Sequence, residues 1–201
     1  MDSYATMYNS LPTLGEADDT FVKRDVIFAA LIPLLAAHQY QFGVCLIHSH
    51  CGVNPGERMI GIGKITEPII PANDTPHYPT RWLPNGDAFE FSSEPTAVPS
   101  AELFYAFKAI VGDLGILGLY YSGGVRPSDD TLELEWTEGR KNITKTVVRA
   151  DAFAGNVETA WLPGTKDPVQ MACVISCDTL LTKGNAYHKQ TKTHRKEPDA
   201  K

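Results

Sequence analysis

The chain has 201 residues, of which 43% are hydrophobic and 21% are charged, a composition typical of one globular domain with a sizeable core. Its net charge is −6, and residues 183–201 hold six Lys or Arg against two acids, which leaves about −10 on the remainder. This charge balance argues against a nucleic-acid partner, because phosphate affinity needs clustered cations on a folded surface.

The N-terminal residues predict a soluble, cytoplasmic protein, because they lack the basic and apolar regions of a secretory signal. The most apolar stretch, residues 26–37, is about twelve residues long, whereas a membrane-spanning helix needs about twenty. We therefore expect no membrane partner. In a reducing compartment the four cysteines are expected to be thiols.

In chain order, we predict an irregular N-terminal segment over 1–18, a single α+β domain over 19–182 and a basic, flexible tail over 183–201. The domain begins with a helix that ends near residue 38, and its apolarity on nearly every face predicts burial on more than one side. Ser100 begins a second, amphipathic helix.

Most of the other segments are predicted strands. They lie at 42–50, 59–66, 87–91, 116–121, 132–136, 143–149, 157–162 and 169–177. In the fifth of these, Glu133 and Glu135 alternate with apolar residues, which predicts a sheet face open to water. Residues 68–86 contain five prolines and predict a long loop.

These elements predict an α+β fold, in which a mostly antiparallel, curved sheet is packed by two main helices. When the chain is shifted by 72 residues, the turn at 52–57 aligns with the turn at 124–129. This match suggests a duplicated α-β-β unit as a further hypothesis. The alternative is that two similar turns arose from the same local need for Gly and Pro.

His48 and His50 are the leading catalytic candidates. Alternating side chains on a strand would place both imidazoles on one face, about 6.6 Å apart, where they could act as an acid and a base or bind one metal ion. Val44 and Leu46 would share that face and make the inner end of a pocket apolar. The alternative is that both histidines simply emerge into solvent at the end of the strand.

A divalent metal, Zn or Fe, would need a third ligand. Glu57 is the nearest candidate and could also assist catalysis, and His77 and His188 are the alternatives. Gly43, His48, His50, Glu57 and Gly63 loosely resemble the first cupin motif, and His-Ser-His resembles the core of the JAMM metalloprotease motif. Each pattern departs from its family in spacing or flanking residues, and we assign no family.

A substrate-binding loop is predicted around Arg81 and Trp82, with the cation holding an anionic or carbonyl group and the indole forming an apolar wall. Tyr120, which aligns with His48 in the shifted comparison, is the third substrate-binding candidate. The alternative is a surface loop whose Trp only packs on the body.

The sequence thus predicts an enzyme that transforms a small molecule without an organic cofactor, as an isomerase, cyclase, lyase or hydrolase. Its pocket would lie between the sheet and a helix. The runner-up is a non-catalytic ligand-binding or protein-interaction protein. A homodimer, formed through the open sheet face or the first helix, is compatible with either function.

Overall fold

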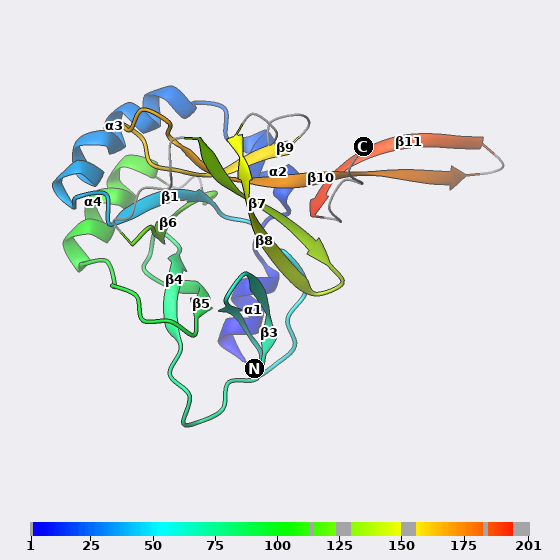
Figure 1. Cartoon of the computed structure of the whole chain (residues 1–201), viewed down its shortest axis with the longest axis horizontal. Coiled ribbons are helices and arrows are strands. Elements are labelled where there is room, and N and C mark those ends of the chain that lie inside the picture. Colours follow the sequence, from blue (N-terminus) through cyan, green and yellow to red (C-terminus); the bar gives the residue numbers. More distant parts are fainter. Residues whose placement is uncertain (1, 113–114, 124–129, 150–155, 183–184, 195–201) are drawn as a thin grey trace.

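A computed structural model shows that the chain forms a closed β-barrel of ten strands with four short helices, which overturns the predicted open sheet packed by two main helices (Figure 1). The structure describes residues 2–112, 115–123, 130–149, 156–182 and 185–194, and from residue 175 onward it describes the backbone alone.

The barrel strands are short and mostly antiparallel. They are β1 (Phe42–Leu46), β2 (Arg58–Ile62), β3 (Ile65–Ile69), β4 (Tyr78–Trp82), β5 (Ala88–Ser92), β6 (Leu117–Tyr121), β7 (Thr131–Glu138), β8 (Lys141–Val148), β9 (Asn156–Trp161) and β10 (Val169–Thr182). Around the barrel their order is β10-β7-β8-β3-β2-β5-β4-β6-β1-β9, and β9 pairs back with β10 to close the ring. The β2–β5 and β7–β10 pairings are parallel.

Irregular pairing helps the sheet to curve and close. The register shifts between Pro79 and Arg81 on β4, and again between Val169 and Ala172 on β10. Such β-bulges bend a strand and increase its twist, as a closed barrel requires. Closure also explains why a sheet face that was predicted to be open to water is instead turned inward.

Two helices occupy the segment that was predicted to be irregular. They are α1 (Ser3–Asn9) and α2 (Leu14–Thr20), and both have side-chain N-caps, from Asp2 and Thr13. The hydroxyl of Tyr4 donates to the carbonyl of Phe89 at 2.7 Å, which ties α1 to β5. The mixed composition of this segment hides the two helices, and the capping residues Asp2 and Thr13 were their available signal.

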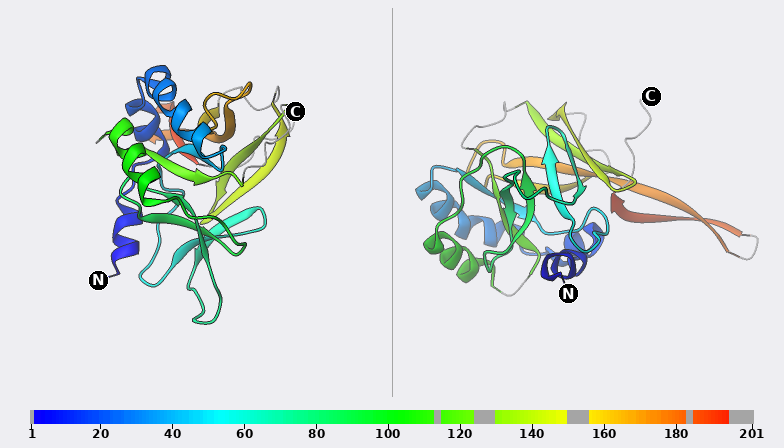
Figure 2. Two further views of the ribbon diagram at one scale, coloured as in Figure 1. Left: turned by 90° about the vertical axis from the view of Figure 1, so that its left-hand side faces the viewer. Right: turned by 90° about the horizontal axis from the view of Figure 1, so that it is seen from below.

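The helices α3 (Arg24–Ala37) and α4 (Ala101–Val111) lie side by side on the outside of the barrel (Figure 2). The predicted cap of α4 is confirmed, because the hydroxyl of Ser100 accepts the Leu103 N–H. The predicted burial of the first helix on more than one side is wrong. It buries one stripe, Ile27, Leu31 and Leu35, while Val26 is 71% exposed.

Two further predictions change with the barrel. The strand expected at 42–50 ends at Leu46, and the Pro-rich loop at 68–86 contains β4. The duplicated α-β-β unit stays a hypothesis. Helix, strand and strand follow in the same order in α3-β1-β2 and in α4-β6-β7, and the parallel pairings β2–β5 and β7–β10 correspond.

Strand β11 (Asn185–His194) lies in the predicted tail and pairs with β10 outside the ring, so that this hairpin extends away from the barrel (Figure 1). The domain boundaries drawn from the sequence stay a prediction. No helix in the described part of the chain is both long enough and apolar enough to cross a membrane.

Candidate functional site

The barrel interior contains a buried cluster of charged side chains. Arg81 on β4 donates from Nη2 to Oε1 of Glu135 on β7 at 2.8 Å, and its Nε lies 3.2 Å from Oε2 of Glu90 on β5. All three residues are at most 6% exposed. Charges so deeply buried are stable only when they are paired, and here one guanidinium bridges two carboxylates.

The strand order shows that this cluster spans the barrel. Arg81 and Glu90 face each other on the neighbouring strands β4 and β5. Strand β7 is separated from β4 by four strands in either direction around the ring, so the contact between Arg81 and Glu135 crosses the lumen. The prediction that Glu135 faces water is therefore wrong, because ring closure turns that face of β7 inward.

His50 extends the cluster from the segment that follows β1. Its Nε2 lies 3.0 Å from Oε1 of Glu90, and its side chain is fully buried. Its backbone N–H donates to the hydroxyl of Tyr8 on α1 at 3.3 Å. His50 is thus fixed between β5 and the N-terminal helix.

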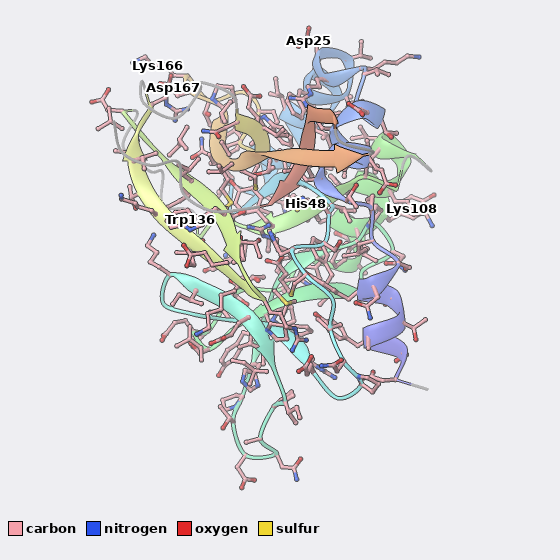
Figure 3. The ribbon with its side chains drawn as sticks, turned by 90° about the vertical axis from the view of Figure 1, so that its right-hand side faces the viewer. Asp25, His48, Lys108, Trp136, Lys166 and Asp167 are labelled. Atoms are coloured by element: carbon pink, nitrogen blue, oxygen red, sulfur yellow. The ribbon has the colours of Figure 1, made fainter. Side chains whose placement is uncertain are left out.

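His48 lies beside His50, with the two ring centroids 4.9 Å apart, near the middle of the molecule (Figure 3). Its Nδ1 lies 2.8 Å from the carbonyl of Leu46, and because a carbonyl only accepts, that nitrogen carries the proton. Nε2 is then an acceptor, and it faces Sγ of Cys173 at 3.8 Å. The predicted proximity of the two imidazoles is confirmed.

Their predicted surroundings are wrong. Val44 and Leu46 pack on the outer side of the barrel against the helices, whereas Ile47 joins the interior cluster. Regular alternation stops where β1 ends, and His48 turns toward the interior beside Cys173. The histidines therefore adjoin charged groups instead of an apolar pocket.

Burial and neighbouring charges together set the pKa values of these groups. Burial raises the pKa of Glu90, but Arg81 and His50 outweigh it and bring the pKa down to about 2. Burial, together with His50 and Arg81, lowers the pKa of His48 to about 3. For Arg81, burial lowers the pKa, and Glu135 and Glu90 raise it well above its usual value. At neutral pH Glu90 is therefore ionised and His48 is neutral.

A cavity of about 280 Å³ reaches this cluster. Arg81, Glu90, Glu135 and Tyr120 are among the residues that line it. This volume lies just below the usual range for ligand sites in proteins, about 300–1,000 Å³. The cavity is large enough for a small metabolite and carries ionised groups along its wall.

The other two substrate-binding candidates, Tyr120 and Trp82, lie on opposite sides of the sheet. Tyr120 lines the cavity, and its ring lies against Gly43, where any added Cβ would stand 2.2 Å from a ring carbon. Trp82 instead points outward, is buried beneath the helices and contacts Phe42 and Phe104. Of the predicted Arg81 and Trp82 pair, only Arg81 faces the cavity.

The candidate third ligands lie elsewhere. The carboxylate of Glu57 binds the guanidinium of Arg140 and accepts the backbone N–H of Asn54, so it serves the loop before β2. His77 is half-buried just before β4, and the side chain of His188 lies outside the described residues. In the described part of the chain, no three His, Cys, Asp or Glu residues come together as metal ligands. The Zn or Fe ion stays a prediction from sequence.

Sequence reasoning missed Glu90 and misplaced Glu135. Glu90 stands between Phe89 and Phe91, so its strand alternates just as β7 does. A carboxylate flanked by large apolar residues on two such strands, together with an Arg on a third, was the available signal for a polar barrel lumen.

Comparison with models of protein families, with curated proteins and with solved structures finds no match to this chain.

Proposed function

We propose that the chain binds a small polar molecule in the barrel lumen, where Arg81, Glu90 and Glu135 contact its polar groups. The observation that supports this is the cavity of about 280 Å³ lined by three charged side chains that are otherwise almost fully buried. Burying charge is expensive, and ligand sites are the usual places where proteins retain it.

The pKa values of the cluster favour binding over proton transfer by these groups. An acid or base that works near neutral pH needs a pKa near 7. The pKa of Glu90, about 2, and that of His48, about 3, are both far below that value. Fixed charge is better suited to holding a ligand in one orientation.

The test is a screen of small metabolites by thermal shift, followed by calorimetry on the full chain. Thr144 lines the cavity from β8, so Thr144→Phe should fill it and abolish binding of any compound found. Val148→Phe adds the same ring on the same strand at a site that is 54% exposed and outside the cavity, and it should leave binding unchanged. Equal binding by both variants would refute the proposal.

Catalysis in the same lumen is the second candidate, and the Glu90–His50 pair favours it. A carboxylate beside an imidazole fixes the ring and its tautomer, which is how a general base is often held. The reaction would be one of those expected from sequence: isomerisation, cyclisation, elimination or hydrolysis without an organic cofactor. In this reading His50 is the base, and His48 is a neutral neighbour that positions it.

Mass spectrometry of bound compounds separates the two candidates. A catalyst should convert its ligand during incubation, and His50→Gln should stop conversion while calorimetry still detects binding. A ligand recovered unchanged from the wild-type chain favours the binding protein. We also place the protein in the cytoplasm, as the sequence predicts, where the free thiols of Cys45, Cys51 and Cys173 would be maintained.

A further inference from the structure

The carboxylates at the inner end of the cavity are already paired. Glu90 lies between Arg81, whose Nε is 3.2 Å away, and His50, whose Nε2 is 3.0 Å away. Glu135 accepts from Nη2 of the same arginine at 2.8 Å. A charged ligand would have to draw one of these groups away from its partner, which is costly in a site shielded from water. The inner end therefore favours a ligand without net charge.

The outer end of the cavity is paired in the same way. Lys64 donates to both oxygens of Glu133 at 3.0 Å, and its side chain is 60% exposed, so this pair marks where the cavity opens to solvent. The hydroxyl of Thr146 also donates to Glu133, at 2.7 Å. The cavity thus presents an ion pair at its mouth and a second, larger network at its inner end.

The inner network has hydrogen-bonding capacity that its ion pairs do not use. A guanidinium has five N–H groups, and neither contact of Arg81 with a glutamate involves Nη1. A carboxylate has about four acceptor sites, whereas Glu135 contacts Arg81 and the thiol of Cys173 in the described part of the chain. A donor and an acceptor are therefore available side by side.

Threonine hydroxyls add groups that both donate and accept. Thr66, Thr80 and Thr144 line the cavity, and their hydroxyls make no hydrogen bond within the described residues. Thr144 faces the lumen, because it stands opposite Glu135 on the neighbouring strand. The hydroxyl of Thr66 also lies at the wall, since a Cβ added at Gly61 would stand 3.2 Å from it. The wall is therefore polar between its two ion-paired ends.

These groups match the alcohols of a sugar or another polyol. Each alcohol can donate to a glutamate oxygen and accept from Arg81 or a threonine, so it adds hydrogen bonds without separating an ion pair. An aliphatic ligand would instead leave the same polar groups without partners, which is unfavourable once water is displaced. A zwitterion would compete with the existing pairs at both of its charges.

We propose that the lumen binds a small neutral molecule with several hydroxyl groups, a monosaccharide or a cyclic polyol, whose alcohols contact Arg81, Glu135 and Thr144. The assignment rests on the proposed function, because it names the chemical class of the molecule bound there. The cavity of about 280 Å³ is suited to a single ring of this kind.

Calorimetry on the full chain with matched probes tests this class. Binding is expected within a panel of neutral pentoses, hexoses and cyclitols that includes myo-inositol. Cyclohexanol, which has the same ring with one hydroxyl, should not bind, and neither should the zwitterions glycine and L-serine. Affinity for the polyol should stay the same between about 0.01 M and 1 M salt, because a neutral molecule has no charge to be screened.

A conservative variant tests the assigned contact. Thr144→Val removes one hydroxyl and nearly preserves the shape of the side chain, so polyol affinity should fall about fivefold, as expected for the loss of one hydrogen bond. Thr75→Val is the matched control, because it makes the same change at an exposed site that does not line the cavity, and affinity should stay within about twofold. Equal affinity in the two variants would overturn the assignment.

The outcomes separate the two proposals. If the zwitterions bind, Thr144→Phe abolishes that binding and no polyol binds, the lumen is a ligand site but the neutral polyol is wrong. Binding of cyclohexanol as tight as that of myo-inositol also overturns the polyol, because the hydroxyls would then contribute nothing. If neither these probes nor the metabolite screen reveals binding that Thr144→Phe abolishes, both proposals fall.

Discussion

Two neighbouring residues of β4 face opposite environments. Trp82 points outward into the apolar layer beneath α3 and α4, where it is 2% exposed among Phe42, Phe104 and other apolar residues. Arg81 points inward and bridges two carboxylates across the lumen. One side of the sheet is thus a conventional hydrophobic core, and the other is a buried electrostatic network.

The two regions contribute to stability in different ways. Burial of apolar surface is favourable at about 25 cal/mol per Å² and depends little on pH or salt. A buried ion pair gains attraction but loses hydration, so its net contribution is often near zero. The outer layer therefore accounts for most of the stability, and the paired charges of the lumen contribute little to it.

The largest loss of stability is expected from a substitution in the lumen. Arg81→Met keeps most of the side-chain volume but removes the guanidinium that bridges Glu90 and Glu135, and we expect a loss of about 3–5 kcal/mol in the free energy of unfolding. Urea denaturation at neutral pH measures it. Arg140→Met is the matched control, because Arg140 also pairs with a glutamate but its side chain is 45% exposed.

Such an exposed pair contributes about 0–1 kcal/mol, so Arg140→Met should have little effect. If Arg81→Met cost no more than this control, the buried network would not depend on its guanidinium. The contrast between the two faces of β4 would then be wrong.

The apolar layer could largely be predicted from sequence, because its signals are local. The stripe of Leu103, Phe107 and Val111 on α4 follows the helical period, and Ser100 marks where that helix begins. The strands predicted at 132–136 and 143–149 are present as β7 and β8. These features can be recognised from residues that are close together in the sequence.

The lumen could not be predicted in the same way, because it depends on closure of the ring. Glu135 alternates with apolar residues, and whether that face meets water or another wall is decided by β9 pairing with both β1 and β10. Pairings between distant strands leave no periodic signal in one sequence. His48 and His50 were found because they are only two residues apart in the sequence, whereas their partners Cys173 and Glu90 lie far along the chain.

A second, smaller effect appears on acidification. The pKa of His48 is lowered to about 3 in the folded chain, below its usual 6.5, so the unfolded chain binds the proton first as the pH falls. Its contribution to stability is present above pH 6.5 and is lost as the pH falls toward 3. Between pH 6.5 and 4.5 we expect this loss to reach about 2 kcal/mol.

Urea denaturation at several pH values measures that slope, and His48→Asn should flatten it, since the amide can still donate to Leu46 but does not titrate. Leu35→Ala, in the fully buried stripe of α3, should lower stability by about 2–5 kcal/mol and leave the slope unchanged. A slope that persisted in His48→Asn would assign the acid sensitivity to other groups. Glu90 adds to the loss below pH 4.5, because its pKa is about 2.

The smallest effect on stability is expected at Tyr8, which connects an apolar cluster to His50. The ring of Tyr8 is fully buried in an apolar cluster, while its hydroxyl accepts the backbone N–H of His50 at 3.3 Å. Tyr8→Phe keeps the ring and removes that acceptor, so stability should fall by about 1 kcal/mol. Tyr105→Phe, at a site that is 81% exposed, should change it by less than about 0.5 kcal/mol in the same urea experiment. Equal values for the two variants would mean that the hydroxyl of Tyr8 adds nothing to stability, and that His50 is positioned by Glu90 without help from Tyr8.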